Sequence, residues 1–295
     1  MRDLRLDLEA RGGIARVRTL CRLGHTPKQL SRAVRSGLLT RPRDGWVATP
    51  DADPTAFRAV QLGGRLASNS ALVSYGVWVD DAESLVVAVR PNASRLPPLL
   101  VGERRIWDLD RFPSEAGAEW RVSVLDALLD LARSATPSSL VASVDSAVHG
   151  GLIDDAGVLE LCALAPSRHR RLTDEVDRRA ESGNETRLRI SLRRAGLDVK
   201  VQVDLPLVGR VDLLVEGWLI VEADSRAHHG TTGDQDRDRR RDGNAVLIGC
   251  GVVRFMPESI ASAPDWCLEV VRARLRQGRP VTGSGHRAAT RGILT

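Results

Sequence analysis

The sequence has few aromatic and cysteine residues and no long apolar run. Aromatic side chains make up 3% of its 295 residues, so the cores must be built from Leu, Val, Ala and Ile. The four cysteines are far apart and form no C-x-x-C pair, which argues against a zinc site or a disulfide framework and favours a reducing compartment. No apolar run reaches membrane-spanning length, and the N-terminus lacks the apolar core of a signal peptide. We therefore expect a soluble, cytoplasmic protein without membrane contact.

The charge is basic, and almost all of the cations are arginines. The formal net charge is +5. Arginine makes planar, bidentate contacts with phosphate, so this bias favours a nucleic-acid partner. A genome rich in G and C enriches arginine as well, and that origin explains part of the bias. The length suits two or three domains.

The first fifty residues carry much of the positive charge, with eleven cations against four acids. Apolar spacing predicts helices over 3–10, 15–23 and 27–36, the last beginning with Thr26 as N-cap and Pro27 in its first turn. Segments 38–41 and 46–49 flank a turn sequence and predict a β-hairpin. Together these elements predict a winged helix-turn-helix over 1–50. The expected DNA contacts are Lys28, Arg32 and Arg35 on the third helix, and Arg41 and Arg43 on the wing. A small helical module that contacts another domain or protein is the alternative.

The remaining chain divides by composition. Residues 51–165 predict a mixed α/β region without a recognisable set of catalytic residues. Residues 166–182, where charges of both signs alternate, predict a connecting helix. Residues 278–295 have few core residues and predict a disordered tail. Residues 183–277 are expected to form the last domain.

That last domain shows an ordered series of elements. The expected order is α-β-β-β-α-β-α, over residues 184–195, 199–203, 211–215, 218–221, 234–247, 252–255 and 266–275. Acidic residues lie among apolar ones here, with Asp212 on the second strand and Glu222 and Asp224 at the end of the third. Burying several carboxylates side by side is costly unless a cation compensates. A divalent metal with oxygen ligands is the simplest such cation, and enzymes that use such a metal commonly act on phosphate esters.

Six motifs follow one another in this domain: Glu185-Thr-Arg-Leu-Arg, Gly209-Arg-Val-Asp-Leu-Leu-Val, Val221-Glu-Ala-Asp, His228-His229-Gly230, Asp236-Arg-Asp-Arg-Arg-Arg-Asp242 and Val253-Arg-Phe255. In this order they resemble the DUF559 family, a relative of the very-short-patch-repair mismatch endonucleases in the PD-(D/E)XK superfamily. Residues 12–47 and the block 123–133 resemble AbiEi-type antitoxins. The resemblance implies an α/β multidomain chain: an N-terminal winged helix-turn-helix, a mixed α/β middle region and a C-terminal restriction-endonuclease-like domain.

The resemblance also implies roles for individual residues. Asp212, Glu222 and Glu185 would hold Mg²⁺ or Mn²⁺. Asp224 stands where many superfamily members have Lys, which removes the usual cationic stabiliser. His228 or His229 would serve as general base or phosphate contact, and the two are not separable by sequence. Arg237, Arg240 and Arg241 would bind flanking phosphates.

These expectations favour a metal-dependent DNA endonuclease that hydrolyses phosphodiester bonds and is delivered to DNA by a winged helix. The alternative is a non-catalytic, antitoxin-like DNA-binding transcriptional regulator with a degenerate nuclease domain. A third hypothesis is a protein that works by contact with a toxin–antitoxin or repair partner. Homodimer formation, the form of the nucleic acid and the biological pathway stay open.

Overall fold

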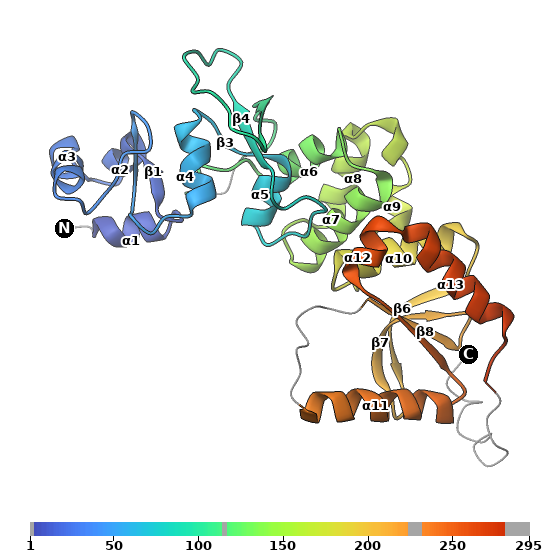
Figure 1. The fold of residues 1–295 in the computed structure, drawn as a ribbon. Coiled ribbons are helices and arrows are strands. Elements are labelled where there is room, and N and C mark those ends of the chain that lie inside the picture. Colours follow the sequence, from blue (N-terminus) through green and yellow to red (C-terminus); the bar gives the residue numbers. More distant parts are fainter. Residues whose placement is uncertain (1–2, 114–116, 224–231, 281–295) are drawn as a thin grey trace. The chain divides into compact units, whose positions relative to one another are not determined.

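The computed structural model describes residues 3–113, 117–223 and 232–280. The chain forms two compact units, which are described separately. The first contains Met1–Thr136 and Leu152–Arg170, and the second contains Pro137–Gly151 and the chain from Arg171 onward. Helices and three small sheets make up both units, so the chain is a multidomain α/β protein, as predicted (Figure 1).

The N-terminal part of the first unit holds the three predicted helices. Its elements are α1 (Leu4–Glu9), β1 (Ile14–Arg16), α2 (Val17–Arg22), α3 (Pro27–Arg35) and β2 (Trp46–Ala48). Helix α3 begins as expected, since the Thr26 side chain accepts from the Gln29 backbone N–H and Gln29 reciprocates in a capping box. The second helix begins later than predicted because residues 14–16 pair with β2 in an antiparallel sheet. The predicted hairpin is reduced to a single bridge between Thr40 and Ala48.

The middle region contains a three-stranded sheet and short helices. Its elements are α4 (Pro54–Gln61), β3 (Arg65–Leu66), α5 (Ser68–Ser74), β4 (Leu85–Val89), β5 (Glu103–Trp107), α6 (Val124–Ala132), α8 (Asp155–Leu164) and the 3-10 turn η1 (Ser167–His169). The strand order is β3-β4-β5, with β4 and β5 parallel. Trp120 joins this region to the N-terminal helices, because its Nε1 donates to the Arg11 carbonyl at 2.7 Å.

The second unit is built on a four-stranded sheet. Its elements are α7 (Pro137–His149), α9 (Leu172–Glu175), α10 (Gly183–Arg194), β6 (Val199–Leu205), β7 (Gly209–Val215), β8 (Leu219–Ala223), α11 (Thr232–Leu247), β9 (Gly251–Phe255), α12 (Pro257–Ser262) and α13 (Pro264–Arg276). The order along the sheet is β6-β7-β8-β9, antiparallel except for the parallel pair β8 and β9. The predicted α-β-β-β-α-β-α series is present, with α12 as an additional short helix.

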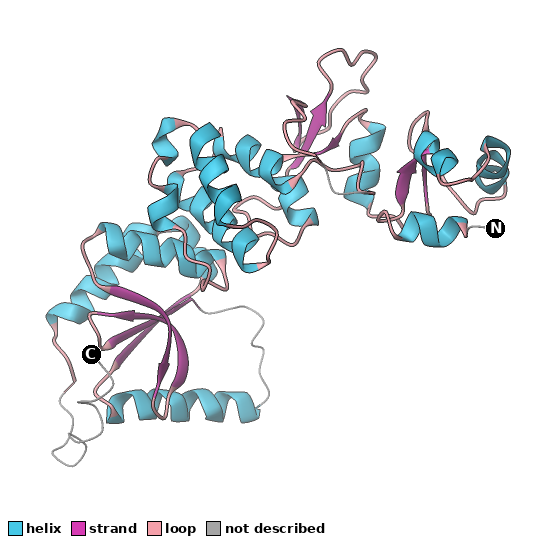
Figure 2. Cartoon of the chain, turned by 180° about the vertical axis from the view of Figure 1, so that it is seen from behind, coloured by secondary structure: helices cyan, strands magenta, loops and turns pink. Residues whose placement is uncertain are grey.

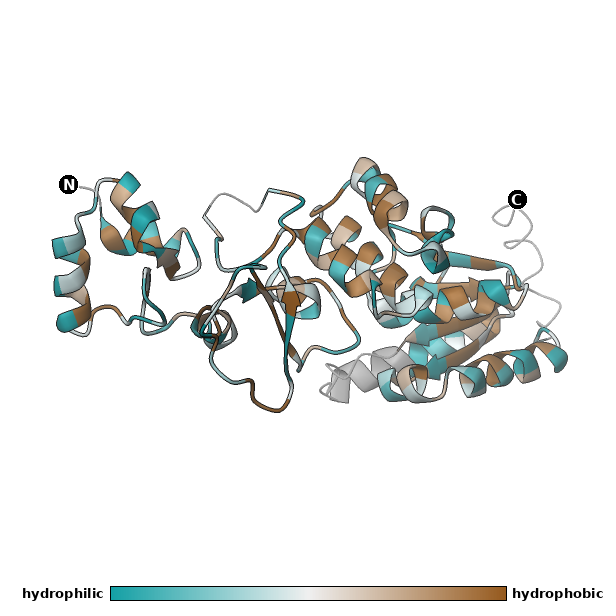
Figure 3. Cartoon of the chain, turned by 90° about the horizontal axis from the view of Figure 1, so that it is seen from above, coloured by the Kyte–Doolittle hydropathy of each residue, from teal (hydrophilic) through white to brown (hydrophobic). Residues whose placement is uncertain are grey.

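Helices cover both faces of this sheet (Figure 2). Leu188 of α10, Ile260 of α12 and Val271 of α13 pack with strand residues on one face. Ala245 of α11 packs with a second set on the opposite face. The strands therefore carry apolar side chains on both faces, and brown segments run along their ribbons in Figure 3.

The charged segment 166–182 differs from the single connecting helix that its alternating charges predict. It contains only η1 and the four-residue α9. Several of its charges instead have fixed partners: the Glu175 carboxylate binds Arg194 at 2.8 Å, and Asp177 binds Arg179 at 2.8 Å. Helix α7, which the sequence assigns to the middle region, groups with the C-terminal sheet.

Candidate active site

Glu185 lies in the first turn of α10, where the sequence predicts it. The Ser182 side chain caps the helix by accepting from the Glu185 backbone N–H at 3.2 Å. The Glu185 side chain is buried, and its Oε2 accepts from the Glu181 backbone N–H at 3.1 Å and from Gln202 Nε2 at 2.9 Å. Among the described residues its Oε1 has no hydrogen-bond partner.

In strands β6 and β7, the regular alternation of side chains between the two faces of the sheet is interrupted next to Glu185. Side chains along a regular strand alternate, so every second residue faces the same side. In β6, however, Val201 packs with the α10 side, whereas Val203 packs with the α11 side. Gln202 lies between them with φ +51, a left-handed conformation that non-glycine residues rarely adopt.

The same change occurs in β7, where Leu213 packs with the α10 side and Val211 with the α11 side. The strand register places Asp212 opposite Gln202, and this is the one position between 199–205 and 209–215 at which the two strands do not pair. Asp212 therefore lies at the distorted position, where the alternation of side chains between the two faces is interrupted.

Asp212 is the carboxylate whose charge is least compensated. Its Oδ2 accepts from the Ala223 backbone N–H at 3.0 Å, and within the described residues it has no ion pair. Burial, followed by the negative charges of Glu185 and Glu222, raises the Asp212 pKa to about 6. Glu185 and Glu222 thus both lie near enough to Asp212 to act on it electrostatically.

Glu222 has both oxygens bound by arginines. Its Oε1 lies 2.7 Å from Arg241 Nη2 of α11, and its Oε2 lies 2.8 Å from Arg254 Nε of β9. The register explains the second contact, because Glu222 and Arg254 are direct neighbours on the parallel strands β8 and β9. Arg254 also binds Asp242 of α11, which raises the Arg254 pKa and lowers that of Asp242.

Each of the three carboxylates is oriented by different partners. In the part of the chain that the structure describes, no three His, Cys, Asp or Glu side chains are arranged to hold a metal ion. The physical reason lies in the contacts above: Glu185 is held by Gln202, Asp212 by the Ala223 backbone and Glu222 by two arginines. Asp224, His228 and His229 lie outside the described residues.

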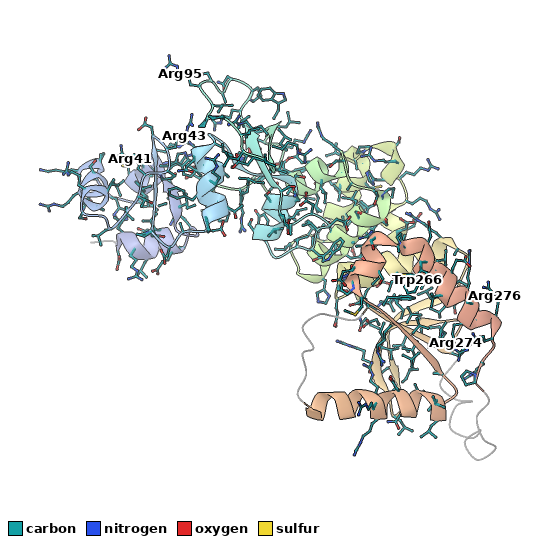
Figure 4. All side chains as sticks on the ribbon, in the orientation of Figure 1. Arg41, Arg43, Arg95, Trp266, Arg274 and Arg276 are labelled. Atoms are coloured by element: carbon teal, nitrogen blue, oxygen red, sulfur yellow. The ribbon has the colours of Figure 1, made fainter. Side chains whose placement is uncertain are left out.

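The predicted DNA contacts on α3 are exposed and uncompensated. Lys28, Arg32 and Arg35 lie at helical spacing on this helix, and none of them makes an ion pair with a described residue. Arg41 and Arg43 follow on the loop before β2 (Figure 4). Arg41 is exposed, but Arg43 is half-buried and donates from Nη1 to the Gln61 carbonyl at 3.2 Å.

The arginines of α11 are used in different ways. Arg240 is exposed, whereas Arg241 also donates to the Val208 carbonyl at 3.1 Å besides binding Glu222. Arg237 belongs to α11 by its backbone, but its side chain lies outside the described part. Arg241 therefore has partners in the free protein, whereas Arg240 makes no ion pair with a described residue.

Two residues of the site do not stand out from the sequence as site residues. Gln202 is an ordinary polar residue within a strand pattern, and only its left-handed φ and its bond to Glu185 distinguish it. Arg254 lies in the Val253-Arg-Phe255 motif, which marks it as notable but does not reveal its partner.

Comparisons with known proteins add little. No protein-family model matches this chain, and no curated protein matches it. Among solved structures, the chain is similar to the crystal structure of the RV2827C protein from Mycobacterium tuberculosis, at 20% identity and a TM-score of 0.26. That similarity covers 57% of this chain and 73% of the other. No helix within the described residues is long and apolar enough to cross a membrane.

Proposed function

We propose that this protein is a metal-dependent DNA endonuclease, delivered to DNA by a winged helix-turn-helix at its N-terminus. The observation that carries the proposal is Asp212, a half-buried carboxylate whose pKa is raised to about 6 by burial and by the negative charges of Glu185 and Glu222. Concentrating like charges at a strand distortion lowers stability, so such an arrangement favours a role in binding a cation.

The free oxygens define which residues would hold the metal. Asp212 Oδ1 and Glu185 Oε1 have no hydrogen-bond partner among the described residues, and oxygen donors suit Mg²⁺ or Mn²⁺. Glu222 would join them only by releasing Arg241 or Arg254. A bound divalent ion would supply charge stabilisation at a phosphate and an activated water.

The arginines beside Glu222 suit the phosphodiester substrate. Many relatives in the resembled superfamily carry Lys where this chain has Asp224, and Arg254 and Arg241 bring positive charge to the same strand end. Guanidinium groups form bidentate contacts with phosphate oxygens. In this proposal the pair binds Glu222 in the free protein and turns to the phosphate when DNA arrives.

The N-terminal helices would supply the DNA contact. The α3 cations Lys28, Arg32 and Arg35 form an exposed basic row on a helix with a capped N-terminus, which suits insertion along a DNA groove. Arg41 lies beyond the helix and would supply the wing contact, whereas the bond of Arg43 to the Gln61 carbonyl favours a structural role.

The test is a cleavage panel over duplex, mismatched, branched and single-stranded DNA and RNA, with Mg²⁺ or Mn²⁺. The wild-type protein is expected to cut at least one DNA form, and Asp212→Ala to abolish cutting while keeping its circular dichroism spectrum and cooperative unfolding. Cutting that survives Asp212→Ala, or that needs no metal, overturns the assignment.

One observation favours a second candidate, an antitoxin-like DNA-binding regulator with a degenerate nuclease domain. Both oxygens of Glu222 are engaged by arginines, which leaves two rather than three available carboxylates. This candidate predicts a shifted band with a specific promoter fragment in a gel assay, together with no heat of Mn²⁺ binding by calorimetry.

A further inference from the structure

We propose that Gln202 is a positioning residue of the candidate metal site, which fixes the Glu185 carboxylate through its side-chain amide. The inference rests on the proposed function and deepens it. It starts from the left-handed φ of +51 at Gln202, within a strand that otherwise runs in regular antiparallel register.

The conformation of Gln202 has no local cause in the sequence. Turns and loops account for left-handed residues elsewhere in this unit, such as Leu207 in the β6–β7 turn and Glu216 in the β7–β8 turn. Gln202 instead lies in the middle of β6, where neither a turn nor a glycine is present. Strained backbone of this kind persists where surrounding contacts require it, and it is concentrated at functional sites.

The distorted backbone at Gln202 directs its side-chain amide toward Glu185. In a regular strand Val201 and Val203 would share one face of the sheet and Gln202 would lie on the other. Here Val201 and Val203 lie on opposite faces. From the distorted position the Gln202 amide reaches Glu185 Oε2 on the neighbouring helix, with an Nε2–Oε2 distance of 2.9 Å.

This bond determines which Glu185 oxygen remains available. Oε2 receives both the Gln202 amide and the Glu181 backbone N–H, so the second oxygen, Oε1, is left for a ligand. The register places Gln202 opposite Asp212. Gln202 thus lies next to both carboxylates that we assign to the metal: it donates a hydrogen bond to Glu185 and lies opposite Asp212 on the neighbouring strand.

The experiment compares Gln202→Asn with Leu207→Asn in the full-length protein. Asn tolerates a left-handed backbone better than Gln or Leu, so both variants are expected to keep the fold. In Gln202→Asn the side chain is one methylene shorter, and its amide no longer reaches Glu185. Gln202→Asn is therefore expected to weaken Mn²⁺ binding by about 10-fold or more, the size typical of losing a residue that orients a metal ligand. Leu207 is exposed in the β6–β7 turn and makes no hydrogen bond with Glu185 among the described residues, so Leu207→Asn should leave Mn²⁺ affinity unchanged.

Calorimetric titration of Mn²⁺ and thermal unfolding are the two readouts, and neither depends on cleavage. Equal Mn²⁺ affinity in the wild type and Gln202→Asn overturns the role of Gln202 while leaving the metal site standing. A wild-type protein that binds no Mn²⁺ overturns the metal site and the role of Gln202 together. A Gln202→Asn variant that binds Mn²⁺ weakly, with the Leu207→Asn control intact, supports both.

Discussion

Arg189 of α10 and Asp145 of α7 form an ion pair in the interior of the second unit, with Nη2 and Oδ2 2.6 Å apart and both side chains 1% exposed. The pair is well satisfied on the carboxylate side. Asp145 also accepts from the Thr186 hydroxyl at 2.6 Å and from the Asp177 backbone N–H at 2.8 Å. It therefore ties α7 and the segment before α10 to the same helix that carries Glu185.

Removing one member of this pair is expected to destabilise the second unit strongly. Asp145→Asn and Arg189→Met each leave a buried charge without its partner, which typically costs about 3–5 kcal/mol of unfolding free energy. Replacing both with apolar residues of similar size should cost much less. The measurement is urea denaturation of the full chain, followed by circular dichroism.

A surface pair provides the control for this prediction. Glu269 and Arg272 of α13 are 2.9 Å apart, with side chains 58% and 42% exposed, so Glu269→Gln should change the unfolding free energy by less than about 1 kcal/mol. Equal effects at the buried and the exposed pair would contradict the importance of burial.

Asp212 is expected to cost stability at neutral pH. Its folded pKa of about 6 lies above its ordinary value of 3.8, so the folded state binds its proton more tightly than the unfolded state. The cost is absent below about pH 4, grows between about pH 4 and 6, and is complete above that range. Asp212→Asn should therefore raise Tm at about pH 7.5 and have little effect at about pH 3.5. Added Mn²⁺ should raise the wild-type Tm near neutral pH but not that of the variant.

A pH-independent effect of Asp212→Asn on Tm would show that the carboxylate is not strained by its charged neighbours. The variant should also lose cleavage. A variant that is more stable and inactive at once is the combination expected of a residue kept for function at the expense of stability.

The cations of α3 are expected to dominate the salt dependence of DNA binding. Each of Lys28→Ala, Arg32→Ala and Arg35→Ala should reduce the slope of log affinity against log salt concentration by about 1, because each removes one phosphate contact. Fluorescence anisotropy over a salt series measures the slope. Arg5→Ala of α1, whose guanidinium is already paired with Glu9 at 2.8 Å, should leave it unchanged. An equal decrease in all four variants would indicate a general charge effect in place of a docking helix.

Arg254 is expected to compete with metal for Glu222. Arg254→Met frees Glu222 Oε2, so it should tighten Mn²⁺ binding in calorimetry while lowering cleavage, since a phosphate-binding cation is lost. It should also lower the unfolding free energy by about 1–2 kcal/mol, because Asp242 loses its partner as well. Arg276→Met of α13 is the control, since Arg276 is exposed and makes no ion pair with a described residue (Figure 4). Unchanged Mn²⁺ affinity in Arg254→Met would contradict the competition.

The order of elements follows from local signals in the sequence, and only the packed structure sets the contacts of the site. Thr26 with Gln29 and Ser182 before Glu185 fix helix starts through hydrogen bonds to nearby backbone, so the sequence is sufficient to place α3 and α10. Apolar runs likewise determine β7 and β8, and their acids Asp212 and Glu222.

The tertiary structure decided what those acids contact. The arginines that bind Glu222 come from α11 and β9, and Asp145 meets Arg189 across 44 residues of chain. The change of faces at Gln202 and Asp212 depends on how two layers of helices pack against one sheet. Local hydrogen bonding and apolar periodicity act over a few residues, whereas these contacts exist only after distant segments have packed together.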